Sequence, residues 1–380
     1  MSQTATLTEL RVEAGTRFFE QHAEHLARLC KLMSERFSAG GRLVALGATP
    51  PARSDARHVA VEFVHPVIVG KRALPALALA AEGGELAIQV KLLVRPADIA
   101  IAFGADSDGG QAAAAIAVAA ATGALTIGFG GSGAEHEMVP ATGDQSVDQE
   151  IVETLYHVLW ELVHVFFEHA GRGGRGGGAS SFLYPFLDDQ ARDGEALVDD
   201  VRRSVLMKSR ETSDLRRQTL ADNAAALEAA AEALRQSFSQ GGKLLAIGNG
   251  GSATDAMDVV ADFRAGGRPA IDLTEDPGIL TAIANDVGVE ATFMRQVIAY
   301  GEPGDALIAL STSGGSRNIL AALAEARNRG LVTIAFVGYD GGAIAAEQLA
   351  DHVIISRSEY IPRIQEAQAS AYHVLQALVS

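Results

Sequence analysis

The sequence has little of several residue types that would indicate particular classes of protein. Its 380 residues include a single cysteine, Cys30, which excludes a disulfide framework and a cysteine-rich zinc site. Aromatic residues make up only 6% of the chain, whereas hydrophobic residues reach 48%. This balance is typical of a globular protein with enough apolar material for a sizeable core.

Long apolar segments are also missing. The longest candidate, residues 112–129, is rich in alanine and interrupted by Gly123, so it indicates a helix, a turn and a strand rather than a membrane span. The first 15 residues lack a basic segment followed by an apolar run, which argues against a secretory signal. We therefore expect a soluble cytoplasmic protein without a membrane partner.

Positive charge is scarce. Lys and Arg total 31 against 47 Asp and Glu, and the formal net charge is −16. A nucleic-acid partner would require a basic patch that releases counterions. The one candidate, GRGGRGGG at 171–178, has two arginines and no interleaved aromatic residues. We interpret it as a flexible linker and expect no nucleic-acid partner.

The strongest feature that the sequence does contain is an internal repeat. Three pairs of segments match between the two halves: 37–47 with 238–248, 54–63 with 254–263, and 149–159 with 365–375. Such self-similarity indicates two copies of one domain. We predict domains at 1–170 and 190–380, joined by a Gly- and Arg-rich linker at 171–189.

Apolar runs of strand length alternate with helical patterns in both halves. The predicted strands of the second half are 243–247, 306–310, 331–337 and 352–356. Those of the first half are a short buried strand at the end of 37–47, and 98–103 and 124–129. Helical patterns lie between them, notably at 254–265 and 316–329. Fully apolar strands that alternate with helices indicate a parallel sheet covered on both faces. We predict two doubly wound, flavodoxin-like α/β domains, each preceded by a long amphipathic helix, at about 7–37 and 190–238.

Two loops of the second half follow predicted strands and are rich in glycine and hydroxyl groups. They read GNGGSAT at 248–254 and STSGGS at 311–316. In parallel α/β sheets ligands bind beyond the carboxyl ends of the strands, and helix N-termini bind anions. Neither loop has the lysine of a nucleotide P-loop, so the pair suits a compact phosphate monoester. The alternative is two ordinary strand-to-helix turns with serine caps.

These motifs also carry a family resemblance. AIGNGGSATDAM, AIANDVGVE and ALSTSGGSRNIL resemble the SIS (sugar isomerase) domain, and within it the bacterial phosphoheptose isomerases, which act on sedoheptulose 7-phosphate. The resemblance covers most of 190–380, whereas the first half resembles the family in outline only. It implies a phosphosugar ketose–aldose isomerase. The implied substrate contacts are Asn249, Gly250, Gly251, Ser252, Ser311, Thr312, Ser313 and Ser316 for the phosphate, and Asp286 and Gln365 for the sugar.

The resemblance further implies a metal site, usually for zinc, built from a helix pattern DAMHxxxE and a late RIQE…H. The corresponding residues here are His58, Glu62, Gln149 and His157 in the first half, and Gln365 and His373 in the second. At the earlier pair the second half has Asp258 and Asp262 instead. The implied proton carriers are Glu62, His373 and Asp262. On its own, the His58–Glu62 spacing would by default indicate a solvated pair on a helix.

The two halves therefore have complementary defects. The half with intact phosphate loops has a changed metal pair, and the half with prolines at 50 and 51 has all four metal-type residues. We hypothesise that the halves specialise and share one composite site, because family members place their active sites at subunit interfaces. The same resemblance predicts that two tandem chains form a homodimer, a pseudo-tetramer of SIS domains.

Two other functions are compatible with the sequence. One is a non-catalytic SIS protein that binds a phosphosugar or a protein partner as a sensor, which Asp258 and Asp262 favour. The other is a metal-dependent isomerase or lyase for a different phosphosugar. The retained histidines, glutamate and glutamines favour an enzyme, because a pure binding module has no physical need for them.

Overall fold

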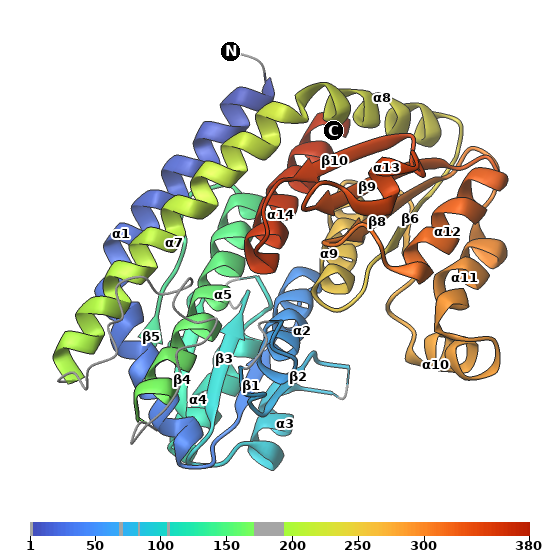
Figure 1. Cartoon of the computed structure of the whole chain (residues 1–380). Coiled ribbons are helices and arrows are strands. Elements are labelled where there is room, and N and C mark those ends of the chain that lie inside the picture. The colour runs from blue at the N-terminus through green and yellow to red at the C-terminus, as the bar shows by residue number, and fades with distance from the viewer. Residues whose placement is uncertain (1–2, 68–70, 83, 105–106, 171–193) are drawn as a thin grey trace. The chain divides into compact units, whose positions relative to one another are not determined.

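A computed structural model describes residues 3–67, 71–82, 84–104, 107–170 and 194–380 of the chain (Figure 1). The contacts divide it into two compact units. We call Glu13–Glu211 the first domain, and Thr212–Ser380 with the residues up to Val12 the second. The linker predicted at 171–189 lies outside the described residues, and the boundaries inferred from the repeat stay a prediction.

The first half of the chain alternates helices and strands as expected. Its elements are α1 (Gln3–Ser38), β1 (Leu43–Leu46), α2 (Pro50–Val64), β2 (Ala76–Leu79), α3 (Leu86–Leu93), β3 (Ile99–Phe103), α4 (Gln111–Thr122), β4 (Leu125–Phe129), β5 (His136–Glu137) and α5 (Gln145–Ala170).

The second half repeats this alternation. Its elements are α7 (Gly194–Asp222), α8 (Ala224–Ser239), β6 (Leu244–Ile247), α9 (Gly251–Ala265), β7 (Ala270–Asp272), α10 (Pro277–Asp286), a 3₁₀ turn (Val289–Ala291), α11 (Thr292–Tyr300), β8 (Ala306–Ser311), α12 (Arg317–Asn328), β9 (Val332–Gly338), α13 (Gly342–Ala346), β10 (His352–Ser356) and α14 (Ile361–Val379). None of the described helices combines the length and apolar character that a bilayer span requires.

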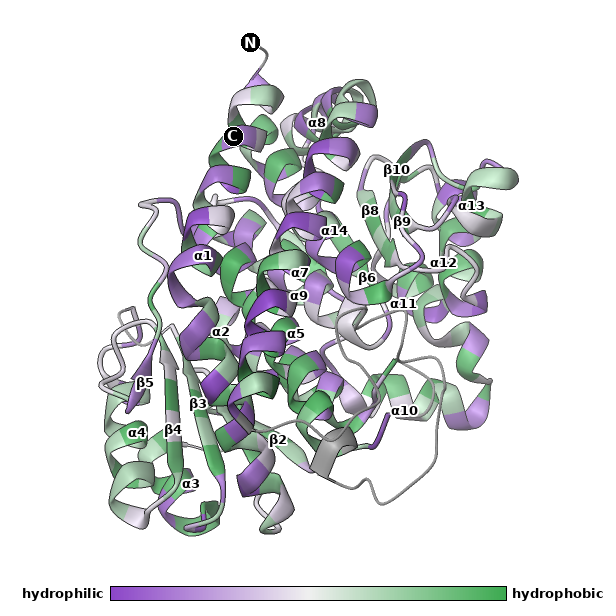
Figure 2. Cartoon of the chain, turned by 60° about the vertical axis from the view of Figure 1, so that its left-hand side comes forward, coloured by the Kyte–Doolittle hydropathy of each residue, from purple (hydrophilic) through white to green (hydrophobic). Residues whose placement is uncertain are grey.

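Each domain contains a five-stranded sheet in which all pairs are parallel. The strand orders are β2-β1-β3-β4-β5 and β10-β9-β8-β6-β7, so both sheets have the same doubly wound topology. Successive residues of β6 alternate between two cores: Leu244 packs in one and Leu245 in the other. The sheets are therefore covered on both faces, and β3 is hydrophobic along its length (Figure 2). The predicted fold class is confirmed.

Three strands were not predicted from the sequence. Two of them, β2 and β7, are edge strands at equivalent positions of the two sheets, β2 beside β1 and β7 beside β6. A third, β5, has only two residues. Edge strands are short and pack on fewer neighbours, so their sequences need no fully apolar run. The apolar runs that were predicted correspond to the inner strands and to β10.

The long helix predicted at 190–238 is interrupted at Asn223, between α7 and α8. The side-chain amide of Asn223 donates to the carbonyl of Ile355 at 3.0 Å, and its Oδ1 accepts the Ile355 N–H at 3.0 Å. Ile355 belongs to the edge strand β10. Asn223 thus satisfies backbone groups that an edge strand would otherwise leave unpaired, and the helix breaks where this pairing is made.

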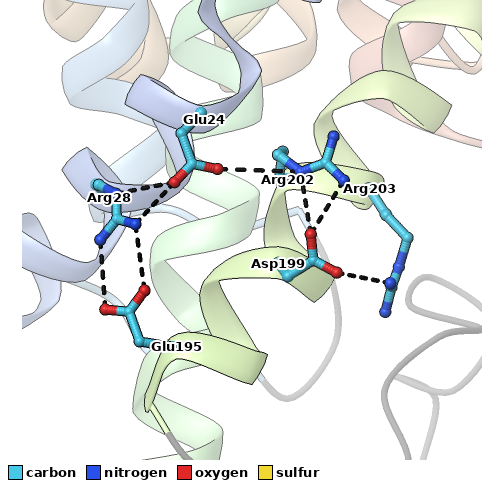
Figure 3. A network of polar contacts seen from close by, with 6 residues as sticks. All are labelled: Glu24, Arg28, Glu195, Asp199, Arg202 and Arg203. Atoms are coloured by element: carbon cyan, nitrogen blue, oxygen red, sulfur yellow. Dashed lines mark hydrogen bonds and ion pairs between the residues drawn. The ribbon is translucent and has the colours of Figure 1, made fainter.

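Within the first domain, α1 is linked to the start of α7 by a network of ion pairs (Figure 3). Arg28 contacts Glu24 of its own helix at 2.8 Å and Glu195 of α7 at 3.2 Å. Arg202 of α7 lies 3.9 Å from Glu24 and 3.0 Å from Asp199. Exposed ion pairs contribute at most about 1 kcal/mol each, so this network mainly fixes the register of two helices that apolar packing holds together.

A buried aspartate joins the first and third strands of both domains in the same way. Asp98 accepts hydrogen bonds from the Arg42 N–H at 2.9 Å and from the Arg42 guanidinium at 2.7 Å. Its counterpart, Asp305, accepts from the Lys243 N–H at 2.9 Å and from the Lys243 ammonium at 2.6 Å. Burial acts to raise the pKa of Asp98, but the hydrogen bonds from Arg42 and Arg95 outweigh it and lower the pKa.

This pKa shift predicts an acid-sensitive contribution to stability. At pH 7, Asp98→Asn should lower the free energy of unfolding by about 2 kcal/mol, as expected for hydrogen bonds to a charged group. Because the folded-state pKa is lowered, the contribution is complete above the ordinary carboxyl pKa of about 4 and is lost as the pH falls through the folded-state pKa. Urea unfolding from pH 7 to pH 3 measures this, and the difference between wild type and variant should shrink. Exposed Asp214→Asn is the control, and a gap independent of pH would contradict the prediction.

Candidate functional site

The first glycine-rich loop of the second domain follows β6 and leads into α9. At Gly248 a β-carbon would lie 1.9 Å from the carbonyl oxygen of Ser252, so only glycine fits this turn. Gly250 has a φ of +57°, which also favours glycine, and the space beside it is open. Ser252 is buried in the first turn of α9. The loop therefore presents bare backbone and a helix N-terminus at the carboxyl end of β6.

The second loop follows β8 and leads into α12. The Ser311 hydroxyl accepts the Gly314 N–H at 3.2 Å, and the Ser313 hydroxyl accepts the Gly315 N–H at 3.3 Å. Ser316 stands at the N-cap of α12, and its side chain makes no capping hydrogen bond. The loop is curled around its glycines, and hydroxyl groups line the entrance to the helix.

Both loops lie at the point of the sheet where the strand order reverses. β6 and β8 are neighbours, and the chain continues from β6 to β7 on the opposite side. The two loops are joined by a reciprocal amide pair: Asn249 donates to Asn318 at 3.0 Å, and Asn318 donates to Asn249 at 2.8 Å. The crevice at such a point is where doubly wound domains bind ligands.

Asn318 was not among the residues predicted from the sequence. It is 8% exposed and lies in the first turn of α12. A polar side chain within the ALSTSGGSRNIL motif was a possible signal, but its partner lies 69 residues away. The side chain of Asn249 is held by Asn318, which links the two loops, and its predicted contact with phosphate stays a prediction.

The acid–base candidates of the second domain lie on α9 and α14. His373 Nε2 is 3.3 Å from Asp262 Oδ2, which brings two predicted proton carriers together. Gln365, on the same helix as His373, is 2% exposed, and Asp258 is 5% exposed. Within the described part of this domain, no three His, Cys, Asp or Glu side chains cluster closely enough to hold a metal. Asp286 is exposed at the end of α10, where it accepts a hydrogen bond from Asn285, and its role stays a prediction.

The first domain brings three of its four predicted metal ligands together. His58 and Glu62 project from α2 and His157 from α5, and one ligand atom of each lies within 4.8 Å of the other two. All three residues are at most 1% exposed. Two imidazoles and a carboxylate are a donor set that suits a divalent metal such as zinc with an open position. The residues present therefore fit a metal.

The remaining predicted ligand, Gln149, lies on α5 two helical turns before His157. It lines a cavity of the first domain, and its buried Nε2 has no hydrogen-bond partner among the described residues. The predicted site residues thus form two sets, a phosphate-loop and acid–base set in the second domain and a metal set in the first. The hypothesis that one site combines the two sets stays a prediction.

Known proteins match this chain at the level of sequence and of fold. The SIS domain model matches residues 209–338. A phosphoheptose isomerase from Roseiflexus sp. (strain RS-1) is 42% identical over 190 residues, which cover 48% of this chain and 94% of that protein. A phosphoheptose isomerase from Thermodesulfovibrio yellowstonii is 41% identical over 175 residues, which cover 44% of this chain and 86% of that protein.

Solved structures extend the likeness to the full chain. The C-terminal domain of glucosamine-fructose-6-phosphate aminotransferase from Francisella tularensis has a TM-score of 0.64 at 9% identity and covers 100% of this chain and 95% of that one. Tagatose-6-phosphate ketose/aldose isomerase from Escherichia coli has a TM-score of 0.59 at 14% identity. The match covers 100% of this chain and 94% of that one. At such identities these structures show the fold alone.

The Asn249–Asn318 pair predicts how the two loops depend on each other. Asn318→Leu removes both amide hydrogen bonds and should weaken binding of inorganic phosphate about thirtyfold, because each of the two bonds is worth about 1 kcal/mol. Calorimetric titration with inorganic phosphate measures the effect. The matched control is Asn328→Leu, the same change at an exposed position at the far end of α12. Equal affinities of the two variants would show that the pair does not organise the site.

Proposed function

Because the chain belongs to the SIS-domain family and is closely similar to phosphoheptose isomerases, we infer that it is an aldose–ketose isomerase acting on a phosphorylated sugar. The observation that carries this inference is the pairing of two hydroxyl- and glycine-rich loops at one strand switch point with an Asp–His pair in the same domain. The loops supply phosphate-binding groups, and the Asp–His pair supplies groups that can move protons.

We propose sedoheptulose 7-phosphate as the substrate and a heptose 7-phosphate as the product. The phosphate would be held by the N–H groups of Gly250 and Gly251, by Ser252 and by the hydroxyls of the loop at 311–316. The backbone donors and the dipoles of α9 and α12 favour a dianion there without a lysine. Asp286 and Gln365 are the proposed contacts of the sugar hydroxyls.

The reaction moves a proton between C1 and C2 through an enediol. The Asp262–His373 pair suits this step, because a carboxylate and an imidazole 3.3 Å apart can hold a proton between them. We propose that one of them takes the proton from the carbon and the other donates a proton to the neighbouring carbonyl oxygen. Glu62 is the corresponding proton carrier of the first domain.

We propose a divalent metal, most simply zinc, as the cofactor, with His58, Glu62, His157 and Gln149 as its first-domain ligands. A bound divalent metal polarises a carbonyl and steadies the negative oxygen that develops during enolisation. The chain's own contribution is a buried, preformed set of donors on α2 and α5, two helices whose packing fixes the distances between the ligand atoms. Gln365 and His373 are the proposed ligands from the second domain.

The remaining proposals concern assembly and location. We propose that two chains associate as a homodimer, the assembly that the family resemblance implies. We place the protein in the cytoplasm, where its buried lone thiol, Cys30, and a phosphosugar substrate belong. A non-catalytic phosphosugar sensor is not favoured, since a sensor has no physical need for an Asp–His pair and a preformed metal set.

The isomerase is tested by proton NMR of the purified protein with sedoheptulose 7-phosphate in D₂O, with and without added zinc. We expect deuterium at the isomerising carbon and a new aldose signal. His373→Ala should reduce the exchange rate at least a hundredfold, as for loss of a general acid or base. A comparable loss in His58→Ala would support a site that draws on both halves. Detectable substrate binding without any exchange would instead indicate a sensor.

The metal set is tested by metal content. After incubation with zinc and gel filtration, wild type should retain bound zinc, and His58→Ala and His157→Ala should each lower its affinity at least tenfold, because each removes one of the converging donors. The control is His65→Ala, which removes an exposed histidine just beyond the end of α2. Retention of the same zinc content by all three variants would exclude this donor set.

A further inference from the structure

The first domain contains a cavity to which the proposed reaction assigns a role at one described residue alone, the proposed metal ligand Gln149. Its volume is about 360 Å³, within the range of small-molecule sites, and all its described lining residues belong to the first domain. Thr49 and Ala52 line it from the start of α2, Gly104 and Ser107 from the loop after β3, and Gln149 from α5. β1 and β3 are neighbours from which the chain continues in opposite directions, so the cavity occupies the switch point of this sheet.

The helix that starts at this cavity lacks two of the three N–H donors of its first turn. α2 begins with Pro50 and Pro51, which have no N–H, and the Arg53 N–H donates to the Thr49 carbonyl at 2.9 Å. In the second domain the corresponding positions are occupied by the glycine-rich turn that precedes Ser252. The first of the two phosphate loops therefore has no working counterpart here.

The loop after β3, which corresponds to the second phosphate loop of the other domain, has its N–H donors occupied by the protein's own carboxylate. Asp108 accepts the N–H of Gly110 at 2.8 Å and the N–H of Ala112 at 2.6 Å, at the N-terminus of α4. The equivalent helix of the second domain, α12, starts after Ser316, whose side chain makes no capping bond. Because Asp108 already supplies the negative charge that the helix dipole favours, a phosphate at α4 would be repelled.

A further anion-binding turn nearby is occupied in the same manner. Glu137 accepts the Gly131 N–H at 2.9 Å, the Ser132 hydroxyl at 3.0 Å and the Ala134 N–H at 3.0 Å. Burial acts to raise the pKa of Glu137, but these and the other hydrogen bonds of the turn lower it, so the carboxylate stays charged. The backbone donors around the loop after β4 are thus not open to a ligand anion.

The groups that do line the cavity suit a different ligand. Two carboxylates, Asp55 and Asp148, face it, and no lysine or arginine is among its described lining residues. Phe103 and Phe129 supply flat apolar surface, and Gln149 supplies an amide. Carboxylates accept strong hydrogen bonds from hydroxyl groups, while the negative field disfavours an anion. We propose that the first-domain cavity binds an uncharged polyhydroxyl compound, a sugar or polyol without phosphate.

The proposal is tested by calorimetry and saturation-transfer NMR with unphosphorylated sedoheptulose as the probe. Wild type should bind it at one site per chain, and excess inorganic phosphate should not displace it. Ser107→Phe, a change at an exposed residue on the cavity wall, should weaken binding at least tenfold and leave phosphosugar isomerisation unchanged. Thr49→Val, which removes one lining hydroxyl without adding bulk, should weaken binding by about threefold to tenfold.

The matched control is Ser313→Phe, which places the same bulk on an exposed residue of the second domain's phosphate loop. It should impair binding of sedoheptulose 7-phosphate and leave sedoheptulose binding intact. The proposal fails if wild type does not bind sedoheptulose, if inorganic phosphate displaces it, or if Ser313→Phe rather than Ser107→Phe abolishes binding. Because the readout is binding of an unphosphorylated sugar, these outcomes stand apart from success or failure of the isomerase assay.

Discussion

The close approach of the first strand of each sheet to the helix that follows it is the constraint on which both domains depend. A β-carbon at Gly47 would lie 2.0 Å from the Ala52 carbonyl oxygen, and one at Gly248 would lie 1.9 Å from that of Ser252. This turn admits no side chain, so it directs the N-termini of α2 and α9 to the switch point of the sheet. The same helices carry His58 and Glu62 in one domain and Asp258 and Asp262 in the other.

Within this shared frame the two domains differ in charge rather than in architecture. The second domain leaves the N-termini of α9 and α12 without a side-chain cap, so both are open to an anion. In the first domain Asp108 occupies the N-terminus of α4, which corresponds to α12, and Pro50 and Pro51 remove two donors from α2, which corresponds to α9. Glu137 also occupies the turn after β4. A carboxylate at a helix N-terminus stabilises the fold by up to about 1 kcal/mol. Asp108 at the N-terminus of α4 therefore adds stability at a position where the carboxylate disfavours phosphate.

The sequence was informative where a feature depends on neighbouring residues or on the repeat. The inner strands could be predicted because residues buried on both faces form continuous apolar runs, and the phosphate loops because glycine and serine cluster after such runs. The short edge strands β2, β5 and β7 could not, since little apolar pattern is needed there. The break at Asn223 was equally hidden, because its cause is a pairing with Ile355, 132 residues away.

In the candidate site, too, features that depend on residues distant in the sequence could not be predicted. The i, i+4 spacing of His58 and Glu62 and the repeat-related position of His157 were visible in the sequence, and the structure brings these three together. The pairing of Asn249 with Asn318 was not visible, because an amide that holds a loop has no local pattern to distinguish it from an exposed one. The self-occupied anion sites were also hidden, because Asp108 and Glu137 could equally have been solvated loop residues.

The aspartates of the second domain alter its chemistry selectively. Asp262 is one methylene shorter than the glutamate of the first domain, yet it still lies 3.3 Å from His373, so the carboxylate–imidazole pair is preserved. Asp258 stands where the first domain has His58, and the second domain alone has no convergent set of three metal donors among its described residues. Proton transfer needs two groups in contact, whereas a metal site needs several donors at fixed distances. Substitution at two positions of one helix can therefore remove a convergent set of metal donors and leave a carboxylate–imidazole pair in place.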